Sequence, residues 1–190
     1  SYTGKAFKCL NHGREKTVYG WQDISLYDYP EIGRRLLANC DIPDLVLFPL
    51  RYPTLKNLNF KAGLEVPVLH IGLWLLSWLV RFKLIKSLKP CANLFHSIGK
   101  WFDIFGSDRS ALHMELKGLG IDGHRLDKKF YIIAGSGHGP NIPCIPSILL
   151  ARKIAAGQYT ATGAQACVGM LNLEEYLDAL SGLNIKTQFD

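Results

Sequence analysis

The chain has 190 residues, of which 48% are hydrophobic and 20% are charged, proportions that exclude intrinsic disorder and fit one globular domain over residues 1–190. The formal net charge of +6 comes from lysines and arginines scattered along the sequence without a nucleic-acid-binding motif. The charge therefore predicts a solvated basic surface and no nucleic-acid partner.

The chain begins with a hairpin pattern. Residues 6–10 and 17–21 alternate in polarity on either side of Asn11-His12-Gly13, which predicts two strands joined by a glycine-containing turn. Residues 34–40 follow a turn that contains Pro30. Two arginines ahead of a short apolar run leave a strand and a short helix both open there.

A helix start is predicted at Asp41-Ile42-Pro43. Asp41 is the expected N-cap, and Pro43 falls in the first turn of a helix that runs from Asp44 to Leu50. The imperfect alternation of residues 54–62 predicts a strand after this helix.

The most apolar segment is residues 66–88. No charge interrupts residues 68–80, and an arginine and three lysines follow at once. The uncharged run is shorter than the roughly 20 residues that span a bilayer, which favours a helix buried in the core or against a partner. Trp74 and Trp78 ahead of a basic cluster keep a second interpretation open, a helix lying at a membrane surface.

After Pro90 the pattern turns to a second helix and a long hairpin. Residues 91–105 repeat apolar side chains at three- and four-residue steps as far as Gly106, the expected C-cap. Residues 111–118 and 129–134 predict the longest hairpin of the chain, with an Asp-Gly pair in its turn.

The last part of the chain predicts four short elements and a glycine loop. The loop precedes the first of them, and Asn172 is the expected N-cap of the last helix. In chain order these are the loop 135–140, a helix over 145–156 ended by Gly157, an extended piece at 164–168, a helix over 172–180 and a strand over 184–189. Hairpins and helices in blocks indicate the α+β class, with a mixed, largely antiparallel sheet and helices packed on one face.

The glycine loop, Gly135-Ser136-Gly137-His138-Gly139-Pro140, does not match a nucleotide-binding motif. The dinucleotide fingerprint needs glycine where Pro140 stands, and it needs an acidic residue about 20 residues later, where none occurs. Two interpretations remain: a backbone concavity that binds an anion ahead of a helix, and a plain turn.

Four side chains are candidates for substrate contacts. Arginines beside glycine present a guanidinium fork to a carboxylate or a phosphate, and ordinary ion pairs with Asp28, Glu31 or Asp108 are the alternative. A loop histidine is either a polar contact of the cleft or a surface residue. The four candidates are Arg34, Arg35, Arg109 and His138.

The cysteines and histidines supply no metal or redox motif. No two cysteines stand as C-x-x-C, and no two histidines come within four residues of one another. We therefore expect no metal site, and we expect the thiols to be buried and reduced in a cytoplasmic protein. The cysteines are Cys9, Cys40, Cys91, Cys144 and Cys167.

Four segments, in order along nearly the whole chain, carry a family resemblance. They are Tyr-Pro-Glu-Ile-Gly-Arg-Arg-Leu-Leu-Ala-Asn at 29–39, Phe-Gly-Ser-Asp-Arg at 105–109, Leu-Leu-Ala-Arg-Lys at 149–153 with Gly157, and Gly-Ala-Gln-Ala-Cys-Val-Gly-Met-Leu-Asn-Leu-Glu-Glu-Tyr-Leu at 163–177. In these segments the chain resembles the C-terminal domain of saccharopine dehydrogenase-like oxidoreductases.

The resemblance implies a fold like the catalytic domain of glyceraldehyde-3-phosphate dehydrogenase. In such proteins an N-terminal Rossmann domain binds NAD(P), and the second domain covers the nicotinamide and often forms the dimer contact. The chain matches only the second domain and is expected to begin inside it. We therefore expect it to bind no cofactor alone, to be inactive in isolation, and to have an upstream Rossmann domain and a second copy as partners.

The apolar residues 66–88 add two functional hypotheses. One is a lipid-like substrate for the oxidoreductase. The other is a non-catalytic interaction domain that is held at a membrane surface or a partner protein through this helix.

Overall fold

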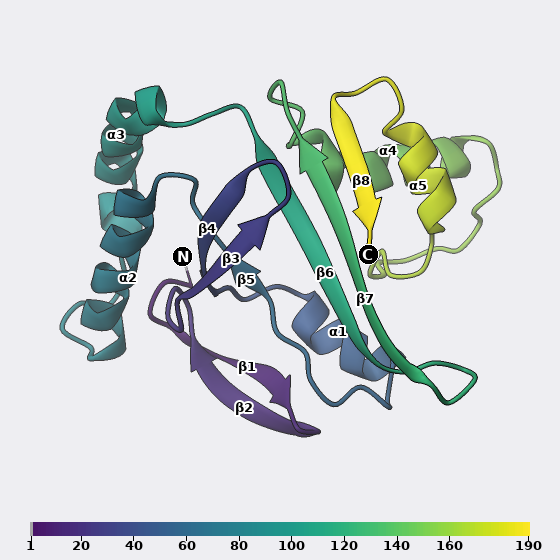
Figure 1. Cartoon of the computed structure of the whole chain (residues 1–190), viewed down its shortest axis with the longest axis horizontal. Helices are drawn as coiled ribbons and strands as arrows, with labels where there is room; N and C mark the ends of the chain where they lie inside the picture. Colours follow the sequence, from purple (N-terminus) through teal and green to yellow (C-terminus); the bar gives the residue numbers. More distant parts are fainter. Residues whose placement is uncertain (1) are drawn as a thin grey trace. The chain divides into compact units, whose positions relative to one another are not determined.

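The computed structural model describes residues 2–190, and contacts divide the chain into two compact units, Ser1–Ser107 and Asp108–Asp190. Within the described residues, three small antiparallel sheets and five α-helices make the α+β fold that the sequence predicts (Figure 1). Separate sheets stand in place of the single mixed sheet that we expected. One domain over residues 1–190 stays a prediction, because two compact units can belong to one domain.

The first unit opens with the predicted hairpin. Strands β1 (Ala6–Asn11) and β2 (Arg14–Tyr19) pair antiparallel, with Ala6 opposite Tyr19. The turn residues His12 and Gly13 both have positive φ, 50° and 74°, as in the type I′ turn. This turn matches the twist of the two strands, so the hairpin is locally determined.

Three strands form the second sheet of the first unit. Its central strand is β4 (Gly33–Asn39), which buries Leu37 and Ala38. Of the two structures left open for residues 34–40, a strand and a short helix, the strand is therefore the one observed. The sequence interpretation missed β3 altogether. In sheet order the strands are β3 (Ser25–Tyr29), β4 (Gly33–Asn39) and β5 (Lys61–Ala62).

Two local predictions in this unit are wrong. Residues 54–62 form no continuous strand, because only β5 and an isolated bridge at Leu58 pair with other residues. Asp41 does not cap helix α1 (Asp44–Arg51), because Pro43 occupies the N-cap position and no side chain bonds to the free N–H groups there. The helix itself is confirmed, and its start next to a proline fits the backbone angle that proline imposes.

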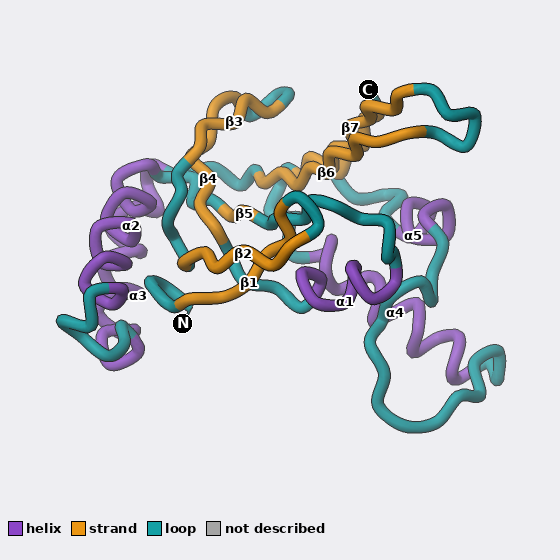
Figure 2. The backbone as a smooth tube through the Cα atoms, turned by 90° about the horizontal axis from the view of Figure 1, so that it is seen from below, coloured by secondary structure: helices purple, strands orange, loops and turns teal. Residues whose placement is uncertain are grey.

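Helices α2 (Pro67–Arg81) and α3 (Ala92–Phe102) gather at one end of the first unit (Figures 1 and 2). Both helices form within the predicted segments, but α2 ends at Arg81, before the expected end at residue 88, and the short 3₁₀ turns η1 (Lys89–Cys91) and η2 (Asp103–Phe105) flank α3. Helix α2 packs against β4 and is only partly buried in the first unit, and burial against a partner stays a prediction. The buried residues of α2 are His70, Ser77 and Val80.

His70, on α2, is completely buried. Its Nδ1 accepts a hydrogen bond from the backbone N–H of Leu64 at 3.3 Å, and its ring meets Trp21 edge-on with the centroids 5.2 Å apart. Nε2 has no hydrogen-bond partner among residues 2–190. Burial lowers the pKa of the imidazole, because the charged form would lose its hydration there.

Acid should therefore destabilise the first unit through His70. A histidine in an unfolded chain has a pKa of about 6.5, so below that pH the unfolded state takes up a proton that folded His70 does not. The free energy of unfolding should be highest above this pH and should fall on acidification by up to about 1.4 kcal/mol per pH unit.

Tryptophan fluorescence can isolate this effect, because all four tryptophans lie in the first unit. In denaturant titrations at several pH values, His70→Gln should reduce the fall in the free energy of unfolding between pH about 6.5 and about 5. The exposed His12 offers a control, and His12→Gln should keep the wild-type slope. If the unfolding free energy of His70→Gln fell with acidification as steeply as that of the wild type, His70 would not be the source of the pH dependence.

The second unit is built on the longest hairpin, as predicted. Strand β7 (Arg125–Ala134) pairs antiparallel with β6 (Ser110–Leu119) on one side and with β8 (Ile185–Phe189) on the other. Its residues 130–134 are all buried and form the core of the unit. Figures 1 and 2 show both helices of the unit on the same face of this sheet. They are α4 (Asn141–Ala155) and α5 (Leu173–Ala179).

Helix α4 begins four residues before its predicted start and contains Pro146. A proline has no N–H, so the carbonyl of Ile142, four residues earlier, loses its helical partner. The hydroxyl of Tyr176 on α5 donates to that carbonyl at 3.1 Å, which ties the two helices together. Burial raises the pKa of this hydroxyl.

The ends of the helices follow local signals. Asn172 caps α5 as predicted, since its Oδ1 accepts from the backbone N–H of Glu175 at 2.7 Å. Gly157, with φ 68°, follows the end of α4 as predicted. The extended piece expected at residues 164–168 belongs to a loop.

The prediction of buried thiols is wrong. Cys91, Cys144 and Cys167 are exposed, and Cys9 and Cys40 are half-buried. The three exposed cysteines lie on short or surface segments that bury few side chains, so sequence hydrophobicity overestimated their burial. Among residues 2–190, no helix combines the length and the hydropathy that crossing a membrane requires.

Candidate functional site

The four predicted contact residues fall in different units. Arg34 and Arg35 lie on β4 in the first unit, and in the second unit Arg109 directly precedes β6 and His138 follows β7.

Arg34 and Arg35 have carboxylate partners in their own unit. Arg34 Nε lies 3.8 Å from Asp28 Oδ2 across the β3–β4 hairpin, and both side chains are exposed. Arg35 Nη2 lies 3.5 Å from Glu65 Oε1. Glu65 Oε2 also accepts the backbone N–H of Ser107 at 2.7 Å, so Arg35 belongs to a link between β4 and the residues after η2. These pairs favour the structural interpretation for both arginines.

The segments of Arg109 and His138 lie beside each other in the second unit. The backbone N–H of Gly137 donates to the carbonyl of Asp108 at 3.1 Å, which joins the glycine loop to the residue before Arg109. A Cβ on Gly139 would stand 2.2 Å from Ser110 Oγ, so the loop approaches the start of β6 more closely than a side chain permits.

Asn184 completes this polar cluster, and sequence reasoning missed it. Its backbone N–H donates to His138 Nδ1 at 2.7 Å, and its Nδ2 donates to Ser136 Oγ at 2.8 Å. The backbone N–H of Gly135 donates to the Asn184 carbonyl at 2.9 Å. We define the polar cluster as Ser136, His138 and Asn184, together with Arg109, whose neighbour Asp108 accepts a backbone hydrogen bond from the loop.

The hydrogen bond to His138 fixes its tautomer. Since a backbone N–H donates to Nδ1, the neutral imidazole carries its proton on Nε2 and can donate it to a carbonyl or carboxylate oxygen. Ser136 holds a left-handed φ of 54°, a conformation of higher energy for a residue other than glycine. The hydrogen-bonded arrangement of Ser136, His138 and Asn184 therefore includes one strained backbone conformation.

The polar cluster also adjoins the N-terminus of α4. This 15-residue helix has no acidic residue in its first turn and no side-chain cap. The side-chain amide of Asn141, its first residue, donates to the His138 carbonyl at 3.2 Å. The positive end of the helix dipole favours an anionic or strongly polarised group at this position.

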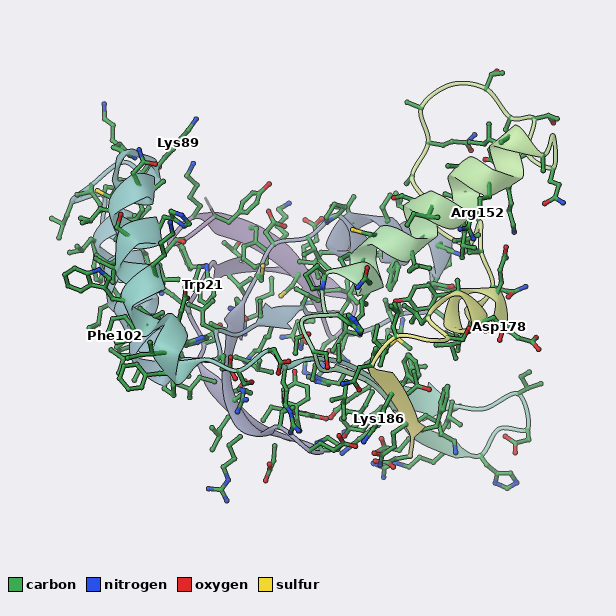
Figure 3. All side chains as sticks on the ribbon, turned by 90° about the horizontal axis from the view of Figure 1, so that it is seen from above. Trp21, Lys89, Phe102, Arg152, Asp178 and Lys186 are labelled. Carbon is green, nitrogen blue, oxygen red and sulfur yellow. The ribbon has the colours of Figure 1, made fainter. Side chains whose placement is uncertain are left out.

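A shallow apolar depression of about 350 Å³ runs along α4 and α5 in the same unit. Its lining is mostly small and aliphatic, with few polar atoms, so it suits an apolar part of a ligand better than a charged one. The lining residues are Pro146, Cys167, Gly169, Leu171, Asn172, Leu173 and Tyr176. Figure 3 shows Arg152 along α4 and Asp178 on α5, the two helices that border it.

The described residues do not fit a dinucleotide cradle. Such a cradle lies between a parallel strand pair and its crossover helix, whereas every strand pairing in the three sheets is antiparallel. Residues 2–190 also contain no cluster of three or more histidine, cysteine or acidic side chains that could hold a metal ion.

No protein-family model matches the chain, and comparison with curated proteins gives no match. The site is therefore characterised by its geometry.

Proposed function

We propose that the chain is the substrate-side and dimerisation half of an NAD(P)-dependent saccharopine dehydrogenase-like oxidoreductase of the cytoplasm. In this proposal a Rossmann domain outside residues 1–190 holds NAD(P), and the chain alone is inactive. The observation that carries it is the polar cluster, in which Arg109 and His138, two side chains selected from the sequence, lie on hydrogen-bonded segments.

The cluster has the chemistry that an acceptor with a carboxylate or carbonyl group needs. Arg109 offers a planar pair of donors, and His138 Nε2 offers a single donor whose direction Asn184 fixes. The strain at Ser136 supports a functional role for the loop, because such conformations concentrate at binding sites. Arg34 and Arg35 belong to the first unit, where Asp28 and Glu65 lie near them, and they carry less of the proposal.

The test uses the natural protein that contains this chain. The oxidation of NADH and of NADPH is followed by absorbance with a panel of 2-oxo acids, imines and long-chain aldehydes as acceptors. Arg109→Gln should raise KM for the acceptor by roughly 10- to 100-fold, because a charge-assisted hydrogen bond of about 1.5–3 kcal/mol is lost. The KM for the dinucleotide should stay unchanged.

Arg125→Gln is the matched control. It removes the same charge at the far end of the β6–β7 hairpin, opposite Leu119, and it should leave both KM values unchanged. His138→Gln should lower kcat or raise the acceptor KM. An intact protein that oxidises neither dinucleotide with any acceptor, or equal effects of Arg109→Gln and Arg125→Gln, would refute the proposal.

A further inference from the structure

Helix α2 is anchored to the first unit by its polar side. Ser77 Oγ accepts from Gln22 Nε2 at 3.3 Å and donates to the carbonyl of Trp74 at 2.6 Å. Arg81 donates to Gln22 Oε1, and its guanidinium carbon lies over the Tyr19 ring, 4.1 Å from the ring centroid. Together with buried His70 and Val80, these contacts turn one side of the helix inward, and part of its apolar side chains is left exposed on the other side.

The outward side of α2 is an apolar stripe. Exposed aliphatic and aromatic side chains recur along it at steps of three and four residues, which places them on one helix face. The same spacing continues on α3, where Trp101 is 80% exposed, and Ile104 in η2 is 81% exposed. The stripe on α2 and just after it is Val68, Ile71, Leu75, Leu79 and Phe82, and that on α3 and η2 is Leu94, Ile98, Trp101 and Phe105.

The charges on this region are mostly positive. From residue 66 to residue 107 the sequence has one acidic residue, Asp103 in η2, against five lysines and arginines. Lys83, Lys86 and Lys89 are exposed on the segment that joins the two helices, next to exposed Phe82 and Leu84. Figure 3 shows Lys89 and Phe102 toward opposite ends of α3.

We propose that these residues form a peripheral binding surface for a bilayer that contains anionic lipids. We call it the α2–α3 surface, and it comprises the two stripes, Ile104 and the three lysines. Apolar side chains with tryptophan enter the interface between headgroups and acyl chains, while the lysines contact anionic headgroups. The 15 residues of α2 extend over roughly 22 Å, less than the ~30 Å hydrocarbon core, so the helix lies at the surface.

Charge complementarity favours a membrane over a second copy of the chain. A contact between two copies of the α2–α3 surface would bring three lysines of each copy together, with Asp103 as the one acidic residue from 66 to 107 to pair with them. An anionic bilayer supplies the missing charge together with the apolar phase that the stripes require. The inference is independent of the proposed hydride-transfer function.

The test is binding of the full chain to phosphatidylcholine vesicles with and without phosphatidylserine, measured by co-flotation. We expect binding to the vesicles that contain phosphatidylserine, with a blue shift of tryptophan emission as exposed Trp101 enters the lipid. Replacing Lys83, Lys86 and Lys89 by glutamate should weaken binding at least about 100-fold, since each basic residue contributes about 1 kcal/mol, or roughly fivefold.

Two further variants make the result specific. Trp101→Ser with Ile104→Ser should weaken vesicle binding at least about tenfold, and both side chains are too exposed for the change to disturb the fold. The control replaces Lys5, Lys16 and Lys56, exposed residues of the first unit outside the α2–α3 surface, by glutamate, which changes the net charge equally. It should lower binding much less than the first triple variant.

Three results would overturn the proposal. The first is no binding to either kind of vesicle, and the second is an equal loss of binding in the two triple lysine variants. The third is that the chain forms a dimer, that Trp101→Ser with Ile104→Ser dissociates this dimer, and that vesicle binding stays unchanged. The last result would assign the surface to a second copy of the chain.

Discussion

Gly4→Ala should cost the first unit about 2–4 kcal/mol of unfolding free energy. A Cβ on Gly4 would stand 2.2 Å from the carbonyl oxygen of Ser77 and 2.7 Å from Val80 Cβ, both on α2. Gly4 also has φ 69°, a conformation that alanine rarely adopts. Overpacking of about 1–3 kcal/mol and left-handed strain of about 1–2 kcal/mol act together. Denaturant unfolding followed by tryptophan fluorescence measures the loss.

Gly72→Ala is the matched control for this prediction. Gly72 lies inside α2, and a Cβ there would meet nothing within 4 Å. Alanine should therefore stabilise the unit by about 0.5–1 kcal/mol, the difference in helix propensity between the two residues. Equal effects of the two substitutions would contradict the close docking of α2 on the N-terminal segment, and with it the outward direction of the apolar stripe.

Ile132→Ala should destabilise the second unit by about 2–5 kcal/mol. Ile132 is 3% exposed on the central strand β7, so the substitution removes apolar contacts and leaves a cavity. Hydrogen exchange of the β7 amides reports on the second unit directly, which matters because this unit has no tryptophan.

Leu126→Ala on the same strand is the control for Ile132→Ala. Leu126 is 37% exposed, so its truncation should cost less than about 1 kcal/mol. If both substitutions had the same effect on exchange, the core of the second unit would not lie at residues 130–134.

Elements with a local signal were predicted correctly. The His12-Gly13 and Asp122-Gly123 turns set the hairpins, and Asn172 begins α5 with a hydrogen bond inside its own first turn. Each of these signals acts between residues that are close in sequence. A single sequence can therefore predict them.

Elements that depend on distant partners were missed. Strand β3 is only five residues long and is defined by its pairing with β4, and residues 54–62 pair with other strands only at Leu58 and at Lys61–Ala62. The orientation of α2 depends on Gln22, which lies 55 residues from Ser77. The apolar pattern of α2 alone contains no sign of which side faces inward.

The candidate site was predicted only in part, because some of its contacts join residues that are distant in sequence. Arg109 and His138 stood out beside glycines, whereas Asn184 lies 46 residues from His138 and reaches it only because β8 follows β7 in the sheet. The one available signal was an asparagine directly before the closing strand. Arg35 could not be assigned to Glu65 from the sequence, because 30 residues separate them.

Titration of NADH and NADPH into this chain and into the natural protein that contains it, followed by calorimetry, tests the proposed division of labour most directly. We predict saturable binding to the natural protein and no binding to residues 1–190 alone. Tight dinucleotide binding by the isolated chain, with reduction of an acceptor, would contradict the account.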